Sequence, residues 1–144
     1  MKNIADYNIS LKVFLQNNKW ETLILKTPED SSFHWKYDFP WGRIDTNEFY
    51  TDLLQILDRE IKEEVWDIQY TIEDKIVAVS RHRAQYSDHK EDIFYPFYEA
   101  KILEWDITLS HEHHNFKWVH LNAINLVDYF ESGMLDAVKM YLKR

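Results

Sequence analysis

Two stretches of the sequence decide the fold: PWGRIDTNE at residues 40–48 and REIKEE at residues 59–64. The second carries Glu60, Glu63 and Glu64, which share one face of a helix at this spacing. Like charges so placed repel by roughly a few tenths of a kcal/mol per pair, and the macrodipole disfavours anions near a helix C-terminus. A divalent cation removes both penalties, because Mg²⁺ is bound by carboxylate oxygens, water and substrate phosphates. Taken alone, such a charge run is more typical of a solvated helix face.

The two stretches together resemble the Nudix box, the signature of the Nudix hydrolases. That pattern has a glycine, a glutamate after five residues, and then an Arg-Glu-aliphatic-x-Glu-Glu run. The matching residues, in order, are Gly42, Glu48, Arg59, Glu60, Ile61, Glu63 and Glu64. The gap before Arg59 holds ten residues instead of seven, and we assign the three extra residues, close to one helical turn, to residues 49–51. Trp41 and Trp66 stand where the family usually has glycines.

The resemblance implies a mixed α/β (α+β) fold, an α/β/α sandwich. Its sheet would be mixed but mostly antiparallel, and the catalytic loop–helix motif would cover residues 42–67 of a single domain spanning residues 1–144. The implied reaction is Mg²⁺- or Mn²⁺-dependent hydrolysis of the diphosphate bond in a nucleoside diphosphate linked to another group. The resemblance leaves that group open. A catalytically silent Nudix-like module that binds nucleotides is the alternative.

The resemblance also assigns roles to the residues of the box. The implied metal ligands are Glu60, Glu63, Glu64 and the backbone carbonyl of Gly42, with one of the glutamates acting as the base. Arg59 is expected to orient a carboxylate, and its spacing to Glu63 suits an ion pair. Glu48 is expected to hold the loop against the helix by binding Arg59 or a loop amide.

Further candidate residues are not part of the box pattern. The resemblance implies a further acidic residue late in the chain, for which Glu112 is the candidate; a surface glutamate is the alternative. Arg43, Arg81 and Arg83 are candidate phosphate contacts. Two aromatic residues, Trp35 and Tyr37, are candidate stacking partners for a base, since exposed aromatic rings stack on bases. For these three arginines and two aromatic residues, an ordinary surface or core position is the alternative.

Hydrophobic periodicity predicts the following elements. Strands are expected at residues 9–15, 20–26, 68–72, 76–80 and 117–121, with one or two more within 93–109. Helical segments are expected at residues 46–66, 122–129 and 134–142. We expect Thr46, Asn47 or Thr51 to cap the first helix, residues 81–92 to form a charged loop, and Gly133 to make a turn before the last helix.

Composition excludes several classes of protein. The chain has 144 residues, a net charge of −8, 45% hydrophobic residues and no cysteine, so disulfide frameworks, zinc ribbons and thiol catalysis are ruled out. An acidic chain disfavours long nucleic acid as a partner but allows a small nucleotide-derived substrate. The N-terminus shows no signal peptide and no stretch is long enough for a membrane span, so we expect a cytoplasmic protein. The family resemblance allows a homodimer.

Overall fold

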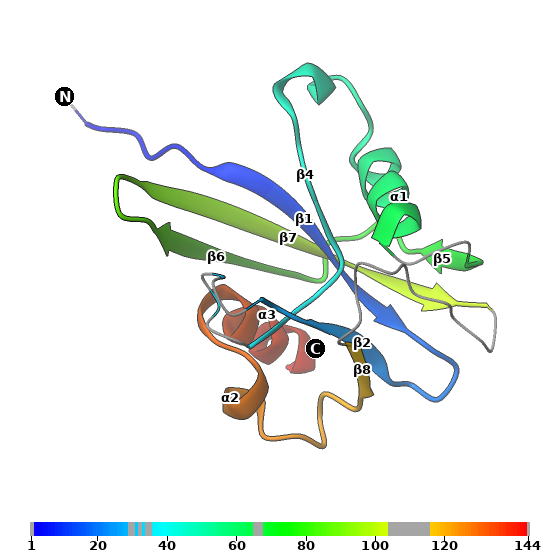
Figure 1. Cartoon of the computed structure of the whole chain (residues 1–144). Coiled ribbons are helices and arrows are strands. Elements are labelled where there is room, and N and C mark those ends of the chain that lie inside the picture. The colour runs from blue at the N-terminus through cyan, green and yellow to red at the C-terminus, as the bar shows by residue number, and fades with distance from the viewer. Residues whose placement is uncertain are drawn as a thin grey trace.

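The computed structural model describes residues 2–28, 31, 33, 36–64, 68–103 and 116–143 (Figure 1). Its strands are β1 (Asn8–Gln16), β2 (Thr22–Lys26), β3 (Tyr37–Asp38), β4 (Trp41–Arg43), β5 (Tyr70–Ile72), β6 (Ala78–Gln85), β7 (Lys90–Ile102) and β8 (Phe116–Val119). Its helices are η1 (Thr46–Glu48, a 3₁₀ turn), α1 (Leu53–Glu64), α2 (Leu126–Tyr129) and α3 (Ser132–Leu142).

The described strands form one eight-stranded sheet around β1 and β7. These two strands run parallel, and every other pairing among the described strands is antiparallel. One edge of β1 pairs with β7 along its length, while the other edge pairs with β4 near the start of the strand and with β2 near its end. The predicted mixed, mostly antiparallel sheet is confirmed.

Each face of the sheet is covered by helices, which gives three layers. Figure 1 shows α1 on one side of β1 and β7, with α2 and α3 on the other. The α1 side of the core includes Leu11, Val13 and Leu15 of β1 with Ile56, Leu57 and Ile61 of α1. The α3 side includes Phe14, Phe39 and Phe97 with Met134, Ala137 and Val138 of α3. The alternation along β1, with Phe14 facing opposite to its neighbours, is that of a strand buried on both faces.

The predicted charged loop at residues 81–92 is wrong, because this region is a β-hairpin. Strand β6 runs to Gln85, and β7 begins at Lys90 and returns antiparallel to it. Burial alternates along β6, with His82 and Ala84 inside while Arg81 and Arg83 face solvent. Arg83 lies directly opposite Asp92, and its Nε donates to Oδ1 of that residue at 2.6 Å. The charges that suggested a loop are therefore the outer face of a strand.

The first helix begins later than predicted, and a different residue caps it. The chain turns twice in this region: Asp45 caps η1, where its side chain accepts from the N–H of Asn47, and α1 starts only at Leu53. Asp52 caps α1, because its Oδ1 accepts from the N–H of Leu54 at 3.3 Å. The extra residues of the box thus lengthen the loop before the helix.

Gly133 serves close packing, and the predicted turn at this residue is wrong. It lies inside α3 and is buried, whereas the positive φ (53°) belongs to Ser132 before it. A Cβ at this position would lie 2.6 Å from the backbone oxygen of Arg81 and 3.0 Å from its carbonyl carbon. The missing side chain therefore lets α3 approach the backbone of β6.

We expect Gly133→Ala to destabilise the protein. The added methyl group meets backbone, which cannot rotate away, and overpacking of this kind costs about 1–3 kcal/mol. For a chain of this length that lowers Tm by about 3–10 °C. Thermal unfolding measures the change, with the exposed Lys139→Ala of the same helix as the control. Because alanine is the better helix former by about 1 kcal/mol, a rise in Tm would contradict the close approach.

No helix in the described part of the chain is both long and apolar enough to cross a membrane.

Candidate active site

The side chain of Glu60 packs directly against the backbone of Gly42, and this contact joins the two halves of the box. Gly42 lies in the middle of β4, and Glu60 lies on α1. A Cβ on Gly42 would come within 3.0 Å of three side-chain carbons of Glu60, with Cβ at 2.9 Å and Cγ closer still. The φ angle of Gly42 is not positive, so the strand conformation itself does not require glycine. The residue is glycine because the carboxylate arm of Glu60 fills the place of its side chain.

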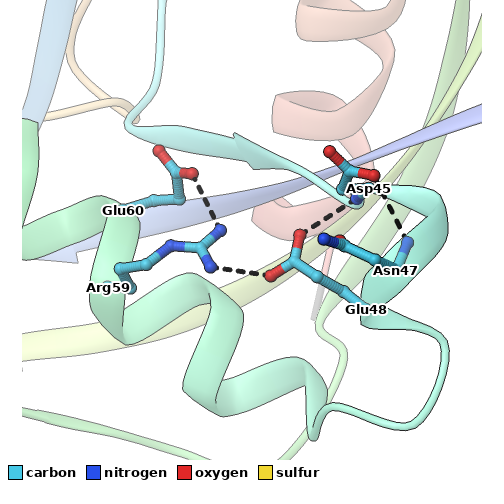
Figure 2. Close-up of polar contacts among 5 residues, drawn as sticks. All are labelled: Asp45, Asn47, Glu48, Arg59 and Glu60. Atoms are coloured by element: carbon cyan, nitrogen blue, oxygen red, sulfur yellow. Dashed lines mark hydrogen bonds and ion pairs between the residues drawn. The ribbon is translucent and has the colours of Figure 1, made fainter.

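Arg59 and Glu48 hold the loop against the helix (Figure 2). Arg59 Nη1 donates to Glu48 Oε2 at 2.7 Å, and Arg59 Nη2 donates to Glu60 Oε1 at 3.3 Å. The other oxygen of Glu48 accepts the backbone N–H of Asp45 at 3.0 Å. Glu48 thus makes both of the predicted contacts, to the arginine and to a loop amide. Arg59 reaches Glu48 and Glu60 instead of the predicted partner Glu63.

Electrostatics in this cluster favour the charged forms. The hydrogen bond from Arg59, and next the one from the N–H of Asp45, hold the pKa of Glu48 below its ordinary value of 4.5. Hydrogen bonds to Glu48 and Glu60 raise the pKa of Arg59. The loop is therefore bound to α1 by a carboxylate that stays ionised throughout the neutral range.

The carboxylates of α1 extend this cluster toward solvent. Glu60 is half-buried, Glu63 is exposed one turn further along the helix, and Glu64 is the last residue of α1. The side chain of Glu64 lies outside the described residues. Within the described part of the chain, no three acidic, histidine or cysteine side chains stand close enough together to hold a metal ion. The predicted three-glutamate ligand set is thus untested.

Strand β4 separates this carboxylate cluster from a cavity. Lys12 pairs with Trp41 and Ser10 with Arg43, whereas Leu11 pairs with Gly42. Because paired residues in antiparallel strands point to the same face, Gly42 faces α1 while its two neighbours face the other side. There, a cavity of about 390 Å³ is lined by all four of those pocket-side residues. The glutamates and the cavity therefore flank one short strand.

No protein-family model matches the chain, and no curated protein matches its sequence. The MutT protein from Methanosarcina mazei has a TM-score of 0.74 at 23% identity, covering 95% of this chain and 94% of that one. A NUDIX hydrolase from Nitrosomonas europaea has a TM-score of 0.67 at 19% identity, covering 98% and 73%. A C. elegans Ap4A hydrolase in a binary complex has a TM-score of 0.61 at 25% identity, covering 94% and 96%.

The chain has the Nudix fold. The resemblance drawn from the box is therefore confirmed at the level of architecture, together with the predicted mixed α and β class. Glu48, Arg59 and Glu60 come together where η1 and α1 of this Nudix fold meet (Figure 2), and Gly42 of β4 lies against Glu60. Residues 49–51, to which we assigned the extra length of the box, lie in the loop between η1 and α1.

The loop between η1 and α1 places two aromatic rings in solvent. Phe49 is 80% exposed and Tyr50 is 96% exposed, and their rings meet edge to face with centroids 5.0 Å apart. Both follow η1 directly and precede the cap of α1 at Asp52. In this Nudix fold Phe49 and Tyr50 therefore lie in an external loop and contribute nothing to the buried side of α1.

The predicted substrate contacts are spread over the Nudix fold. Arg43 lines the cavity beside β4, with its guanidinium paired to Glu91. Arg81 and Arg83 lie on β6 and border a separate hollow with Ser132. Tyr37 packs on Tyr129 of α2 with ring centroids 5.6 Å apart. The two other candidates, Trp35 and Glu112, lie outside the described residues.

Sequence reasoning missed two charged residues that the Nudix fold brings together. Lys12 of β1 is 2% exposed, and its Nζ lies 2.7 Å from Oδ1 of Asp38 in β3. The sequence contained one signal, since Lys12 and Ser10 alternate with Leu11 and Val13. That pattern ordinarily places the polar residues in solvent. Here β4 and β7 flank β1 on both edges, and the polar residues line the cavity instead.

Proposed function

We propose that this chain is a metal-dependent hydrolase that cleaves a phosphoanhydride bond in a small nucleotide derivative. The observation that carries the proposal is the position of Glu60, whose side chain fills the space over Gly42 while Arg59 holds its carboxylate. The C. elegans neighbour is named a hydrolase of Ap4A, a nucleotide derivative with phosphoanhydride bonds. The proposal extends that class of reaction to this chain.

The residues present suit Mg²⁺ or Mn²⁺. Hard divalent cations prefer carboxylate and carbonyl oxygens, and Glu60, Glu63 and Glu64 supply three carboxylates within two turns of α1. The space left by Gly42 is a second argument, because only a glycine at this place in β4 admits the arm of Glu60. We assign the metal to these glutamates. The Gly42 carbonyl, the fourth implied ligand, lies in the ladder opposite Leu11.

The protein's own groups would then position the reacting atoms. Phosphoryl transfer depends mainly on alignment and on neutralising charge, with little covalent help from the protein. A bound divalent cation supplies that charge and lowers the pKa of its water. Arg59 fixes the direction of the Glu60 carboxylate, and Glu48 fixes Arg59. Glu63, exposed beside them, is free to accept a proton from the attacking water.

Metal removal tests the proposed activity. The full chain is incubated with Mg²⁺ and a panel of an NTP, a dinucleoside polyphosphate, ADP-ribose and a nucleotide sugar, and release of phosphorylated products is followed. We expect at least one compound to be cleaved, EDTA to lower that rate by about 100-fold or more, and Mg²⁺ to restore it.

Two results would contradict the proposal. Cleavage that continues in EDTA would remove the metal from the reaction. Tight binding of one compound without cleavage of any would assign the fold to a silent nucleotide-binding module. The Glu63→Gln variant, purified in the same way, identifies any contaminating hydrolase.

A further inference from the structure

The cavity beside β4 is lined by aromatic residues and by the buried ion pair of Lys12 and Asp38, which we call its floor. Trp41, Phe33, Tyr86 and Tyr95 contribute rings to its lining. Lys12 Nζ lies 5.1 Å from the ring centre of Trp41 and 4.9 Å from that of Tyr95, within the range of cation–π attraction. Flat walls with a few convergent polar groups are typical of a site for a planar heterocycle.

The ion pair on the floor is unusual because it is buried. Lys12 is 2% exposed, and its partner Asp38 has a side chain only 13% exposed. Burying such a pair gives little net stability, because desolvation offsets the attraction between the charges. A carboxylate accepts hydrogen bonds and cannot donate them, whereas an ammonium only donates them. The floor therefore offers a ligand the ammonium of Lys12 as a donor and, beside it, the carboxylate of Asp38 as an acceptor.

One oxygen of that carboxylate remains open. Oδ1 of Asp38 already accepts from Lys12 and from the backbone N–H of Phe39, both at 2.7 Å. No donor from the described residues reaches Oδ2 of Asp38. An oxygen of an ionised carboxylate has two acceptor sites, so Oδ2 can receive two N–H groups from a ligand.

Ser10 provides a second, independent sign of a ligand. Ser10 is 2% exposed and lines the same cavity. Its Oγ has no hydrogen-bond partner within the described structure. A buried hydroxyl without a partner is destabilising because its desolvation is not compensated, and native structures keep few such groups. A bound molecule with a polar edge would satisfy Ser10 and Asp38 together.

We propose that this cavity binds the base of the substrate, and that the base carries the amino–keto edge of guanine. This inference rests on the proposed hydrolase function and names the substrate class for it. Guanine presents a keto oxygen, a ring N–H and an exocyclic amine in a row. Asp38 accepts from the two N–H groups, and the ammonium of Lys12 beside it donates to the keto oxygen. Ser10 contributes its hydroxyl to the same edge.

The other common bases fit this floor less well. Adenine, cytosine and uracil each offer a single N–H donor position on the pairing edge, so Oδ2 of Asp38 would stay partly unpaired. Pterins carry the same amino–keto edge as guanine, which makes them the second source of this chemistry. Each well-placed pair of hydrogen bonds to a base discriminates by about 1–3 kcal/mol, which corresponds to roughly 5- to 150-fold in affinity.

The phosphates of such a ligand have a path to the glutamates. Among the described strands β4 pairs only with β1, so its other edge is open. Arg43 stands on the cavity side of β4 with 42% of its side chain exposed, and Gly42 beside it faces Glu60. A chain of phosphates that passes over the unpaired edge of β4 would run from the cavity to the carboxylate cluster.

Equilibrium binding tests the inference without requiring catalysis. GDP, IDP, ADP, UDP and neopterin monophosphate are titrated into the full chain in EDTA, by calorimetry. We expect GDP to bind at least about tenfold more tightly than ADP and UDP, and more tightly than IDP, which lacks only the exocyclic amine. Neopterin monophosphate binding more tightly than GDP would identify a pterin as the source of the edge. Preference for ADP or UDP, or equal binding of GDP and IDP, would overturn the inference.

A double variant tests the residues assigned to the base. Asp38→Asn alone removes one charge of a buried ion pair, so we use Lys12→Met together with Asp38→Asn, which removes both charges and retains an acceptor for Phe39. We expect this protein to fold and the GDP-over-ADP preference to fall below about threefold. The matched control is Asp74→Asn with Lys75→Met, at exposed residues outside the cavity, and it should keep the preference.

The outcomes separate this inference from the proposed function. Preferential binding of GDP with no hydrolysis of any nucleotide would support the base assignment and contradict the hydrolase. Hydrolysis of several nucleotides without base preference would do the reverse. A preference that survives the double variant would place base recognition elsewhere and overturn the inference.

Discussion

Glu63→Gln is expected to lower Mg²⁺-dependent hydrolysis by at least about 100-fold without weakening the fold. The proposed ligand set loses one of its charges, and the water loses its nearest base on the exposed side of α1. A 100-fold loss corresponds to about 2.7 kcal/mol of transition-state stabilisation. Turnover of the cleaved nucleotide at saturating Mg²⁺ gives the measurement.

The thermal stability of Glu63→Gln distinguishes a loss of catalysis from a loss of folding. Glu63 repels Glu60 one turn away and lies near the C-terminal end of α1, so its neutralisation should leave Tm unchanged or slightly higher. The matched control is Glu73→Gln, the same substitution at an exposed residue between β5 and β6. Activity above about half that of the unchanged protein in Glu63→Gln would remove this residue from the reaction.

Gly42→Ala is expected to lower turnover by about 10- to 100-fold with little change in stability. The new methyl group must displace the side chain of Glu60, and misplacing a catalytic group by about 1 Å can cost about 100-fold. Cγ and Cδ of Glu60 can rotate away, whereas Cβ at 2.9 Å moves only with α1. Alanine in a strand regains roughly 0.5–1 kcal/mol of chain entropy, which offsets the cost of that small shift. We therefore expect the free energy of unfolding to stay within about 1 kcal/mol.

A double-mutant cycle identifies the cause. In a Glu60→Ala background the Cγ and Cδ atoms are absent and Cβ, at 2.9 Å, is the one of the three close contacts that remains, so Gly42→Ala should cost much less activity there than it does alone. Additive losses would show that Gly42 acts through something other than Glu60. Comparison with Gly133→Ala is informative, because there the obstacle is the backbone of Arg81 and the loss should appear in Tm.

The parts of the fold with strong local signals could be predicted from the sequence. The β1–β2 hairpin, the amphipathic α1 and α3, and the contacts of Glu48 followed from periodicity and from the box. Helix α1 was predicted to start at residue 46 because Thr46 and Asn47 are good caps. The extra residues at 49–51 allowed a second start, and Asp52 took that role.

The remaining features depend on contacts between distant segments. Nothing local shows that Lys12 will meet Asp38, because β4 and β7 must first flank β1. Nor does the sequence around Gly133 reveal the carbonyl of Arg81 that requires it. The β6–β7 hairpin was missed because its local sequence pattern is misleading. Its outward residues are charged enough to be typical of a loop, and their partners lie on the neighbouring strand.

The parallel pairing of β1 with β7 has a consequence for how the chain acquires its shape during synthesis. Residues 8–16 pair with residues 93–101, so the centre of the sheet cannot close until most of the chain has left the ribosome. Until then α1 lacks part of the surface that buries Ile56, Leu57 and Ile61. Such distant pairing slows folding, and a nascent chain that already carries the whole box presents sticky apolar surface to chaperones.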